Sequence, residues 1–155
     1  MTIPVSTVPA VRKWLFDSIS AALTPDPLDS SAELLVCLDS PGTYQPQDIV
    51  VIGNVATAIS VNSLVGSGGA GWLEERYTVD VDIEVFRGGD SAQQVSERAF
   101  LLGAGVLNCV RSDPSLGTNV LVAKPTASDY SGDETEDHSG RLGTLALKIE
   151  AFQRI

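Results

Sequence analysis

The sequence predicts a single α+β domain in which two helices pack on one face of a largely antiparallel mixed sheet. Its 155 residues suit one domain, and a hydrophobic content of 43% is enough to form a sizeable core. Two segments repeat apolar residues at helical spacing, and several others have the patterns of strands. The predicted order is a helix, three strands, a long strand, a helix and two strands, without an internal repeat, and this order fits an α+β domain.

The first helix is predicted within residues 5–23. Thr7 is placed as its N-cap, and Pro9 is tolerated in the first turn because its missing N–H would have no partner there. Pro25 ends the helical pattern. The stripe expected to face the core consists of Val8, Val11, Leu15, Ile19 and Ala22.

Two short apolar runs follow, at residues 34–38 and 49–52, and both are typical of strands buried on both faces. Gly53-Asn54 is expected to close a hairpin onto a further strand at residues 55–61. The glycine-rich segment 66–71 has too few side chains to pack, so it is expected to be a flexible connector.

The clearest signal is the alternation of apolar and polar residues over residues 76–85, which predicts a long strand with one polar face. Ser91 is expected to cap a second helix that ends near Asp113-Pro114. Gly103 and Gly105 weaken this helix, so they are expected to allow close packing. Its buried stripe is predicted to be Val95, Ala99, Leu102, Val106 and either Cys109 or Val110.

Two more strands are predicted at residues 118–126 and 142–152, and apolar and polar residues alternate in the second of them. The segment between them, residues 128–140, is polar and acidic with almost no apolar residues. We therefore expect it to be a mobile loop.

The charge of the chain limits its partners. Twenty acidic and ten basic residues give a formal net charge of −10, which argues against binding to nucleic acid phosphates. No apolar run approaches the roughly 18 residues of a membrane helix, and the N-terminus lacks the pattern of a signal peptide. The sequence thus predicts a soluble, unexported protein whose Cys37 and Cys109 are reduced thiols rather than a disulfide.

Three motifs suggest chemistry, and each has a simpler interpretation. Residues 66–71 spell GxGxxG, but the strand pattern downstream lacks the helix that a dinucleotide site needs, so a flexible loop is favoured. Asp137-His138-Ser139 has the residue types of a hydrolase triad, yet neighbours in one loop cannot form the relay. Five carboxylates in residues 129–137 make calcium binding conceivable, but they lack the EF-hand spacing, and a solvated charge run is favoured. The sequence also lacks the ligands of a structural zinc site. We therefore predict no catalytic, cofactor or metal site.

Asp80, Asp82 and Glu84 lie on one face of the long strand, because alternate side chains of a strand point the same way. An ordinary solvent-exposed face is the simpler interpretation. The alternative is that these carboxylates line an acidic channel, through which a polyanion would slide without sticking.

The C-terminal half also resembles a known family. The order of its elements is similar to that of the tail terminator proteins of long-tailed bacteriophages, over about residues 74–155. The resemblance depends on a strand, an Arg-Gly-Gly turn, a helix and an Asp-Pro-x-Leu-Gly run, followed by a final strand. These correspond to Glu75–Phe86, Arg87-Gly88-Gly89-Asp90, the helix with Ser96-Glu97-Arg98-Ala99, Arg111-Ser112-Asp113-Pro114-Ser115-Leu116-Gly117, and Gly140–Ile149.

This resemblance implies a structural virion protein and not an enzyme, without a cofactor. Such a protein assembles in the host cytoplasm as a ring, usually of six subunits, at the head-proximal end of the tail. The ring ends polymerisation of the tail tube protein and offers a surface to the head-side connector or stopper protein. Genomic DNA passes through it without sequence-specific binding, and no membrane is involved. The candidate lumen or interface residues are Asp80, Asp82, Glu84, Asp129, Asp133, Glu134, Glu136 and Asp137.

Two alternatives remain open from the sequence. One is another neck or tail-completion protein. The other is a small enzyme or ligand-binding domain that uses the 66–71 loop or the acidic loop. The state of assembly separates them, because rings favour a virion protein and a monomer with a closed polar pocket favours the enzyme or binding domain.

Overall fold

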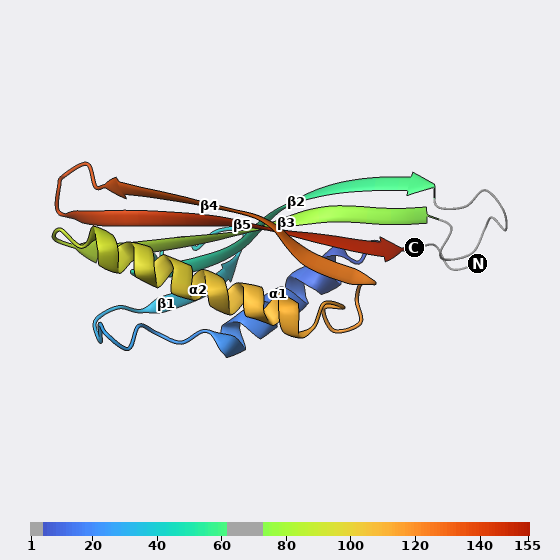
Figure 1. Cartoon of the computed structure of the whole chain (residues 1–155), viewed down its shortest axis with the longest axis horizontal. Coiled ribbons are helices and arrows are strands. Elements are labelled where there is room, and N and C mark those ends of the chain that lie inside the picture. Colours follow the sequence, from blue (N-terminus) through green and yellow to red (C-terminus); the bar gives the residue numbers. More distant parts are fainter. Residues whose placement is uncertain (1–4, 62–72) are drawn as a thin grey trace.

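Five strands form one sheet in the order β1-β2-β3-β5-β4, and both helices cover the same face of it (Figure 1). A computed structural model describes residues 5–61 and 73–155. Only β1 and β2 pair in parallel, so the fold is the predicted α+β domain with a largely antiparallel sheet. The elements are α1 (Val8–Ala22), β1 (Leu34–Leu38), β2 (Asp48–Val61), β3 (Leu73–Gly88), α2 (Ala92–Ser112), β4 (Val122–Glu134) and β5 (Gly140–Arg154).

Strand β3 is the centre of the sheet, and it pairs antiparallel with β2 on one side and β5 on the other. Its odd-numbered residues from Tyr77 to Val85 are buried against the helices, which confirms the predicted alternation. Of the stripe expected on α1, Val11, Leu15 and Ile19 are buried, whereas Val8 is half-buried and Ala22 is exposed at the end of the helix. On α2 the stripe continues through Val110, while Cys109 is only half-buried.

The predicted hairpin at Gly53-Asn54 is wrong. Strand β2 runs continuously through it, with a bulge between Ile52 and Val55, and both parts pair with β3. The extra residue shifts the register by one position without reversing the chain, because β3 offers hydrogen-bond partners on both sides of the bulge. The expectation that β1 is buried on both faces is also wrong, since this edge strand is half-buried over Leu34–Cys37.

The predicted mobile loop at residues 128–140 is largely strand. Residues 128–134 of β4 pair with residues 141–147 of β5, and only residues 135–139 turn between them. Backbone hydrogen bonds to β5 do not require apolar side chains, so a polar segment completes the edge of the sheet. The ring of Tyr130 packs against Phe100 of α2, with 5.3 Å between ring centroids.

The two predicted N-caps occupy the right positions but do not cap. Thr7 precedes α1 and Ser91 precedes α2, yet neither side chain bonds to its own helix. The Ser91 hydroxyl donates instead to the Gly88 carbonyl, 3.2 Å away. Thr7 turns toward β3, as described below.

Gly103 and Gly105 allow the close packing that the sequence predicted. A Cβ added at Gly103 would lie 2.6 Å from Leu145 Cδ2, and one at Gly105 would meet Leu23 Cδ2. Helix α2 therefore lies against β5 at the first glycine and against the end of α1 at the second.

The remaining expectations concern single features of the chain. Cys37 and Cys109 are both free thiols. Within residues 5–61 and 73–155, no helix has the length and apolar character needed to cross a membrane. The glycine-rich connector at 66–71 lies outside the described residues, but β3 begins at Leu73 directly after it, so a strand follows the GxGxxG motif.

Candidate functional site

The face of the sheet opposite the helices, here called the open face, carries most of the predicted acidic residues. On β3 the buried residues have odd numbers, so Asp80, Asp82 and Glu84 point to the open face. Glu84 is exposed, and Asp80 and Asp82 are partly exposed.

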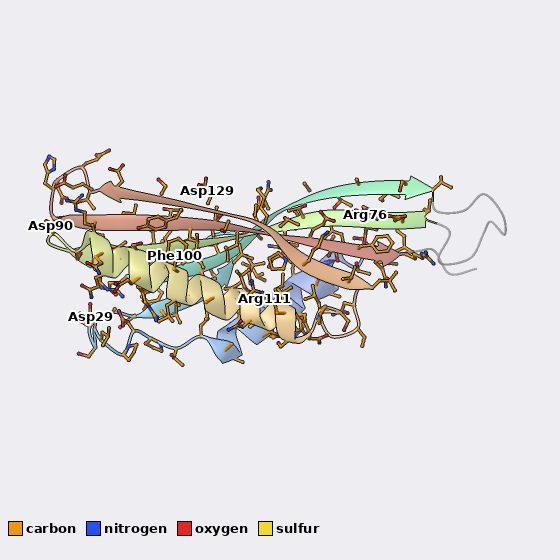
Figure 2. The ribbon with its side chains drawn as sticks, in the orientation of Figure 1. Asp29, Arg76, Asp90, Phe100, Arg111 and Asp129 are labelled. Carbon is orange, nitrogen blue, oxygen red and sulfur yellow. The ribbon has the colours of Figure 1, made fainter. Side chains whose placement is uncertain are left out.

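Strand β4 adds two more carboxylates to the same face. Ala146 of β5 pairs with Asp82 on one side and Asp129 on the other, so these side chains lie in one row across the sheet. Leu142 of β5 likewise pairs with Phe86 on one side and Asp133 on the other. Asp133 therefore also points to the open face. Sequence reasoning did not foresee this convergence, because it depends on the pairing of β4 with β5. The five residues Asp80, Asp82, Glu84, Asp129 and Asp133 are called the acidic face from here on; Figure 2 labels Asp129.

The acidic face has one cation within its rows, Lys148 of β5, whose Nζ lies 3.1 Å from Asp80 Oδ1. Burial raises the pKa of Asp82, and the neighbouring Asp80 carboxylate raises it further. The charges on this surface therefore repel one another. A surface of this kind repels other anions as well.

The other half of the open face is balanced in charge. Arg76, Lys124 and Arg154 share it with Glu74 and Glu150. Arg76 lies 2.7 Å from Glu74 and stacks 4.5 Å above the ring of Phe152. The negative charge of the open face is thus concentrated toward the end of the sheet that carries Gly88 and Gly140, while Arg76 lies toward the opposite end (Figure 2).

The other three predicted residues, Glu134, Glu136 and Asp137, lie outside the acidic face. Glu134 has the same strand parity as Tyr130, so it points to the helix side, and it lies 3.1 Å from His138 Nδ1. Asp137 accepts hydrogen bonds from the Ser139 and Thr135 hydroxyls, which lower its pKa to about 2.

Asp137, His138 and Ser139 do not form a triad. Ser139 donates its hydroxyl to Asp137 at 2.7 Å, whereas the His138 ring contacts Glu134. These contacts close the turn between β4 and β5.

Sequence reasoning missed a buried ionic cluster between β2, β3, α2 and the segment after α1. Asp48 is fully buried, and it accepts hydrogen bonds from Arg87 at 2.7 Å and from Arg98 at 2.9 Å. Arg87 also donates to Asp26 at 2.9 Å, and Arg98 donates to the Thr24 carbonyl at 2.8 Å. One signal in the sequence could have found it: Arg87 is an odd-numbered residue of β3, like the buried residues before it, so it lies on the inward face of the strand.

The cluster favours the charged forms of Asp26 and Arg87. Burial by itself would raise the pKa of Asp26, but the hydrogen bond from Arg87 and that from the Leu28 N–H lower it overall. Burial opposes the charge of Arg87 as well, while Asp48 and Asp26 raise its pKa. These ion pairs tie the segment between α1 and β1 to the sheet, which is a structural role.

A second inward polar residue, Glu75, anchors the start of α1. One carboxylate oxygen of this fully buried side chain accepts from the Thr7 N–H and hydroxyl, both at 3.1 Å. The Thr7 hydroxyl also lies 2.8 Å from the Tyr77 hydroxyl. Burial, with the charge of Glu75, raises the pKa of Tyr77 to about 12 even though the Thr7 contact opposes this shift. Glu75 thus fixes Thr7 at the start of α1, and the Thr7 hydroxyl donates to Glu75 instead of accepting from an N–H of the first helical turn.

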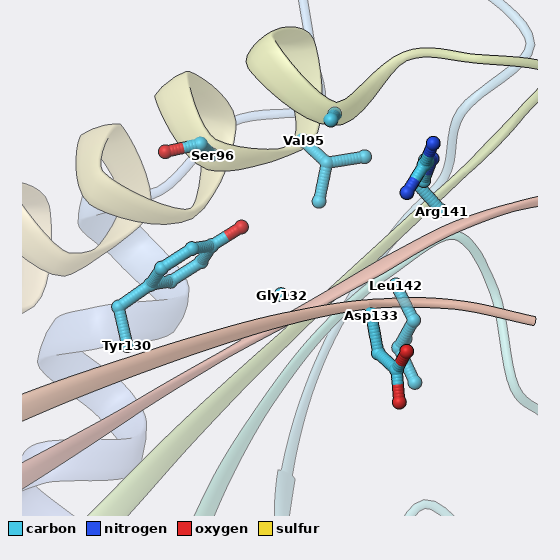
Figure 3. A pocket seen from close by; sticks show the side chains of 8 residues that line it. Val95, Ser96, Tyr130, Gly132, Asp133, Arg141 and Leu142 are labelled. Carbon is cyan, nitrogen blue, oxygen red and sulfur yellow. The ribbon is translucent and has the colours of Figure 1, made fainter.

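A pocket lies between the start of α2 and the β4–β5 hairpin (Figure 3). Tyr130 reaches across it toward α2, while Asp133 and Leu142 point away from the helix. Gly132 lines the pocket, and Gly143 beside it allows Val95 and Tyr130 to pack closely on β5, since a Cβ there would lie 2.6 Å from Val95 and 2.7 Å from the Tyr130 hydroxyl. Arg141 lines the pocket but is already paired with Asp90 at 2.9 Å.

Among the described residues, no group of three or more His, Cys, Asp or Glu side chains is placed to hold a metal ion. No family model matches the chain, and no curated protein matches it at a significant level. The structure thus defines an α+β domain whose sheet has helices on one face and a strongly acidic surface on the other.

Proposed function

We propose that this protein is a tail terminator of a long-tailed bacteriophage. In this role it forms a ring, as a hexamer, at the head-proximal end of the tail tube, stops tube growth and provides the surface for the head-side connector. The observation that carries the proposal beyond the sequence resemblance is the acidic face. Five carboxylates gather on the helix-free side of one sheet, and a single lysine lies among them.

The acidic face suits a surface that lines a passage for DNA. A polyanion near fixed carboxylates gains no ion pairs to hold it, so it passes without adhering. Copies arranged with this face inward would supply a ring of such charge. The helices would then lie on the outside.

Deletion of the gene from the phage tests the role. We expect tails of abnormal length that are not joined to filled heads, because nothing ends polymerisation or offers the connector its surface. Electron microscopy of the particles gives the answer. Normal tails joined to heads would reject the terminator role, whereas tails of correct length that fail to join heads would favour the neck-completion alternative.

Charge reversal tests the passage. Glu84→Lys combined with Asp129→Lys changes two exposed residues of the acidic face, and Glu136→Lys is a matched change in the turn. We expect tails of normal length in all variants but slower DNA ejection in the double variant only, because lysines would bind passing phosphates. Equal ejection rates in the double variant and the wild type would show that the acidic face does not line the passage.

A further inference from the structure

Among the residues that the structure describes, the outer edge of β2 has no partner along its second half. Strand β1 pairs only with Asp48–Ile52, and no strand of the described residues pairs with the outer side of Val55–Val61. Figure 1 shows this part of β2 extending beyond β1 with only β3 beside it. Ile59 is 59% exposed and Val61 is 52% exposed.

The pairing pattern shows which backbone groups are free. The Phe86 N–H donates to the Gln47 carbonyl, so the even-numbered residues of β3 exchange hydrogen bonds with β2. Their partners after the bulge are Ala56, Ala58 and Ser60. The N–H and C=O groups of Val55, Thr57, Ile59 and Val61 therefore point away from the sheet.

This edge lacks the features that protect the other long edge of the sheet. The segment Val55–Val61 has no charged residue, no proline and no internal bulge. On β4, by contrast, Pro125 removes a donor, a bulge follows it, and the Ala123 N–H is occupied by the Pro114 carbonyl at 2.7 Å. The remainder of β4 carries carboxylates.

We propose that the open edge of β2 pairs with the same edge of a second copy of this chain, antiparallel and centred on Ala58. Thr57 of each copy then faces Ile59 of the other in a hydrogen-bonded pair, and Val55 faces Val61. The exposed Ile59 and Val61 side chains become covered, and the two sheets join across a twofold axis.

The charge distribution permits this pairing in spite of the net charge of −10 on each chain. Asp82 lies beside Val51, which is seven positions before Ala58 along β2. At about 3.3 Å per residue along the strand, the Asp82 side chains of the two copies would be roughly 45 Å apart, well beyond a Debye length of about 8–10 Å. Toward Ala58 the open face is balanced in charge, because Arg76, Lys124 and Arg154 share it with Glu74 and Glu150. This twofold contact goes beyond the proposed ring, which needs a different, cyclic contact.

Cysteine trapping tests the register. Ala58 would face Ala58 of the second copy in a non-hydrogen-bonded pair, with Cα atoms about 4.5 Å apart and within reach of a disulfide. Ser60 would face Ala56, so Ser60→Cys is the matched control on the same exposed face. Under oxidised glutathione, we expect Ala58→Cys to form covalent dimers at least tenfold faster than Ser60→Cys. The double variant Ala56→Cys/Ser60→Cys is expected to cross-link as well.

Sedimentation tests the edge itself. Thr57→Pro removes an outward N–H without breaking a hydrogen bond to β3, and Thr57→Ala keeps that N–H. We expect wild type and Thr57→Ala to dimerise with increasing concentration and Thr57→Pro to dimerise at least tenfold more weakly. The melting temperature shows whether Thr57→Pro is folded. If this variant does not fold, the proposed contact is tested by the cross-linking rates of Ala58→Cys and Ser60→Cys alone.

Equal cross-linking of Ala58→Cys and Ser60→Cys would overturn the proposed contact. A wild-type chain that sediments only as a monomer at hundreds of micromolar would also overturn it, as would equal dimerisation of the wild type and a folded Thr57→Pro. None of these results bears on tail length in the deletion phage, so the proposed function is judged separately.

Discussion

Inward-facing positions of β3 hold both the core and the buried charges. Val79, Val81 and Ile83 contact the helices, whereas Glu75 and Arg87 occupy the same face at either end. Each charged residue has hydrogen-bond partners from other elements, which offset the cost of burial. At the scale of the residue, stability therefore depends on which face a side chain occupies and on whether a buried charge has its partner.

The two faces of β3 differ in their tolerance of substitution. Val81→Asp would bury an unpaired carboxylate at a fully buried position, and we expect a loss of several kcal/mol in the free energy of unfolding, on the order of 4. Asp82→Asn removes a carboxylate whose pKa is already raised by burial and by Asp80, so we expect a small gain of about 0.5 kcal/mol at neutral pH. Urea denaturation measures both, and equal midpoints would mean that the faces are wrongly assigned.

Asp48 is the centre of the ionic cluster. Asp48→Asn keeps the shape but removes the charge that both Arg87 and Arg98 contact, and we expect a loss of about 3–5 kcal/mol in unfolding free energy. The control is Asp17→Asn, which breaks an exposed pair with Lys13 and is expected to cost less than about 0.5 kcal/mol. A loss for Asp48→Asn no larger than that for Asp17→Asn would show that the cluster contributes nothing.

Asp26 gives the cluster a pH dependence. Its pKa is lower in the folded chain than the usual 3.8, so its contribution is present above the unfolded pKa and is lost as the pH falls through the folded pKa. We expect Asp26→Asn to be less stable than wild type at pH 6 and the difference to shrink below about pH 4. Thermal melts over this range measure it, and a constant difference would contradict the assignment.

At the scale of the element, strand ends and bulges depend on the neighbouring strand. Alternation identified β3 correctly, but the same method divided β2 at Gly53-Asn54 and ended β4 too early. In both cases the neighbouring strand continues the backbone hydrogen bonds through these positions: β3 does so for β2, and β5 does so for β4. The strand therefore extends past residues that are typical of turns. Helix α2 shows the converse, because its buried stripe was predicted from local spacing and the close packing at Gly103 and Gly105 from their low helix propensity.

The two glycines of α2 should respond differently to alanine. A methyl group at Gly103 would meet Leu145, which is enclosed in the core, so we expect Gly103→Ala to lower the unfolding free energy by about 1–2 kcal/mol. Leu23 beside Gly105 is half-buried at the end of α1 and can move aside. Helix propensity then favours Gly105→Ala by up to about 1 kcal/mol. Chemical denaturation of both variants decides, and a more stable Gly103→Ala would contradict the packing argument.

At the scale of the whole molecule, the net charge of −10 opposes any ring that brings the acidic faces together. Salt screens such repulsion beyond a Debye length of roughly 8–10 Å at ordinary ionic strength. The twofold pairing at β2 separates the acidic faces and should be nearly independent of salt. The two modes of association are therefore distinguishable.

We expect rings to become more abundant as salt and protein concentration rise, because closure of the proposed ring would bring about six acidic faces around one passage. Negative-stain electron microscopy at low and high sodium chloride counts the rings, and sucrose at matched viscosity is the control. Rings that dissociate on addition of salt would contradict an acidic passage and would point to ion pairs between subunits.

The sequence alone determined the α+β class, the long central strand and the buried stripes of both helices, because these follow from local periodicity. It also placed Asp80, Asp82 and Glu84 on one face, since side chains two apart on a strand share a side. Only the tertiary structure decided that Asp129 and Asp133 join them and that Glu134, Glu136 and Asp137 do not. That division depends on the register between β4 and β5, which backbone hydrogen bonds set between segments whose side chains carry little apolar signal.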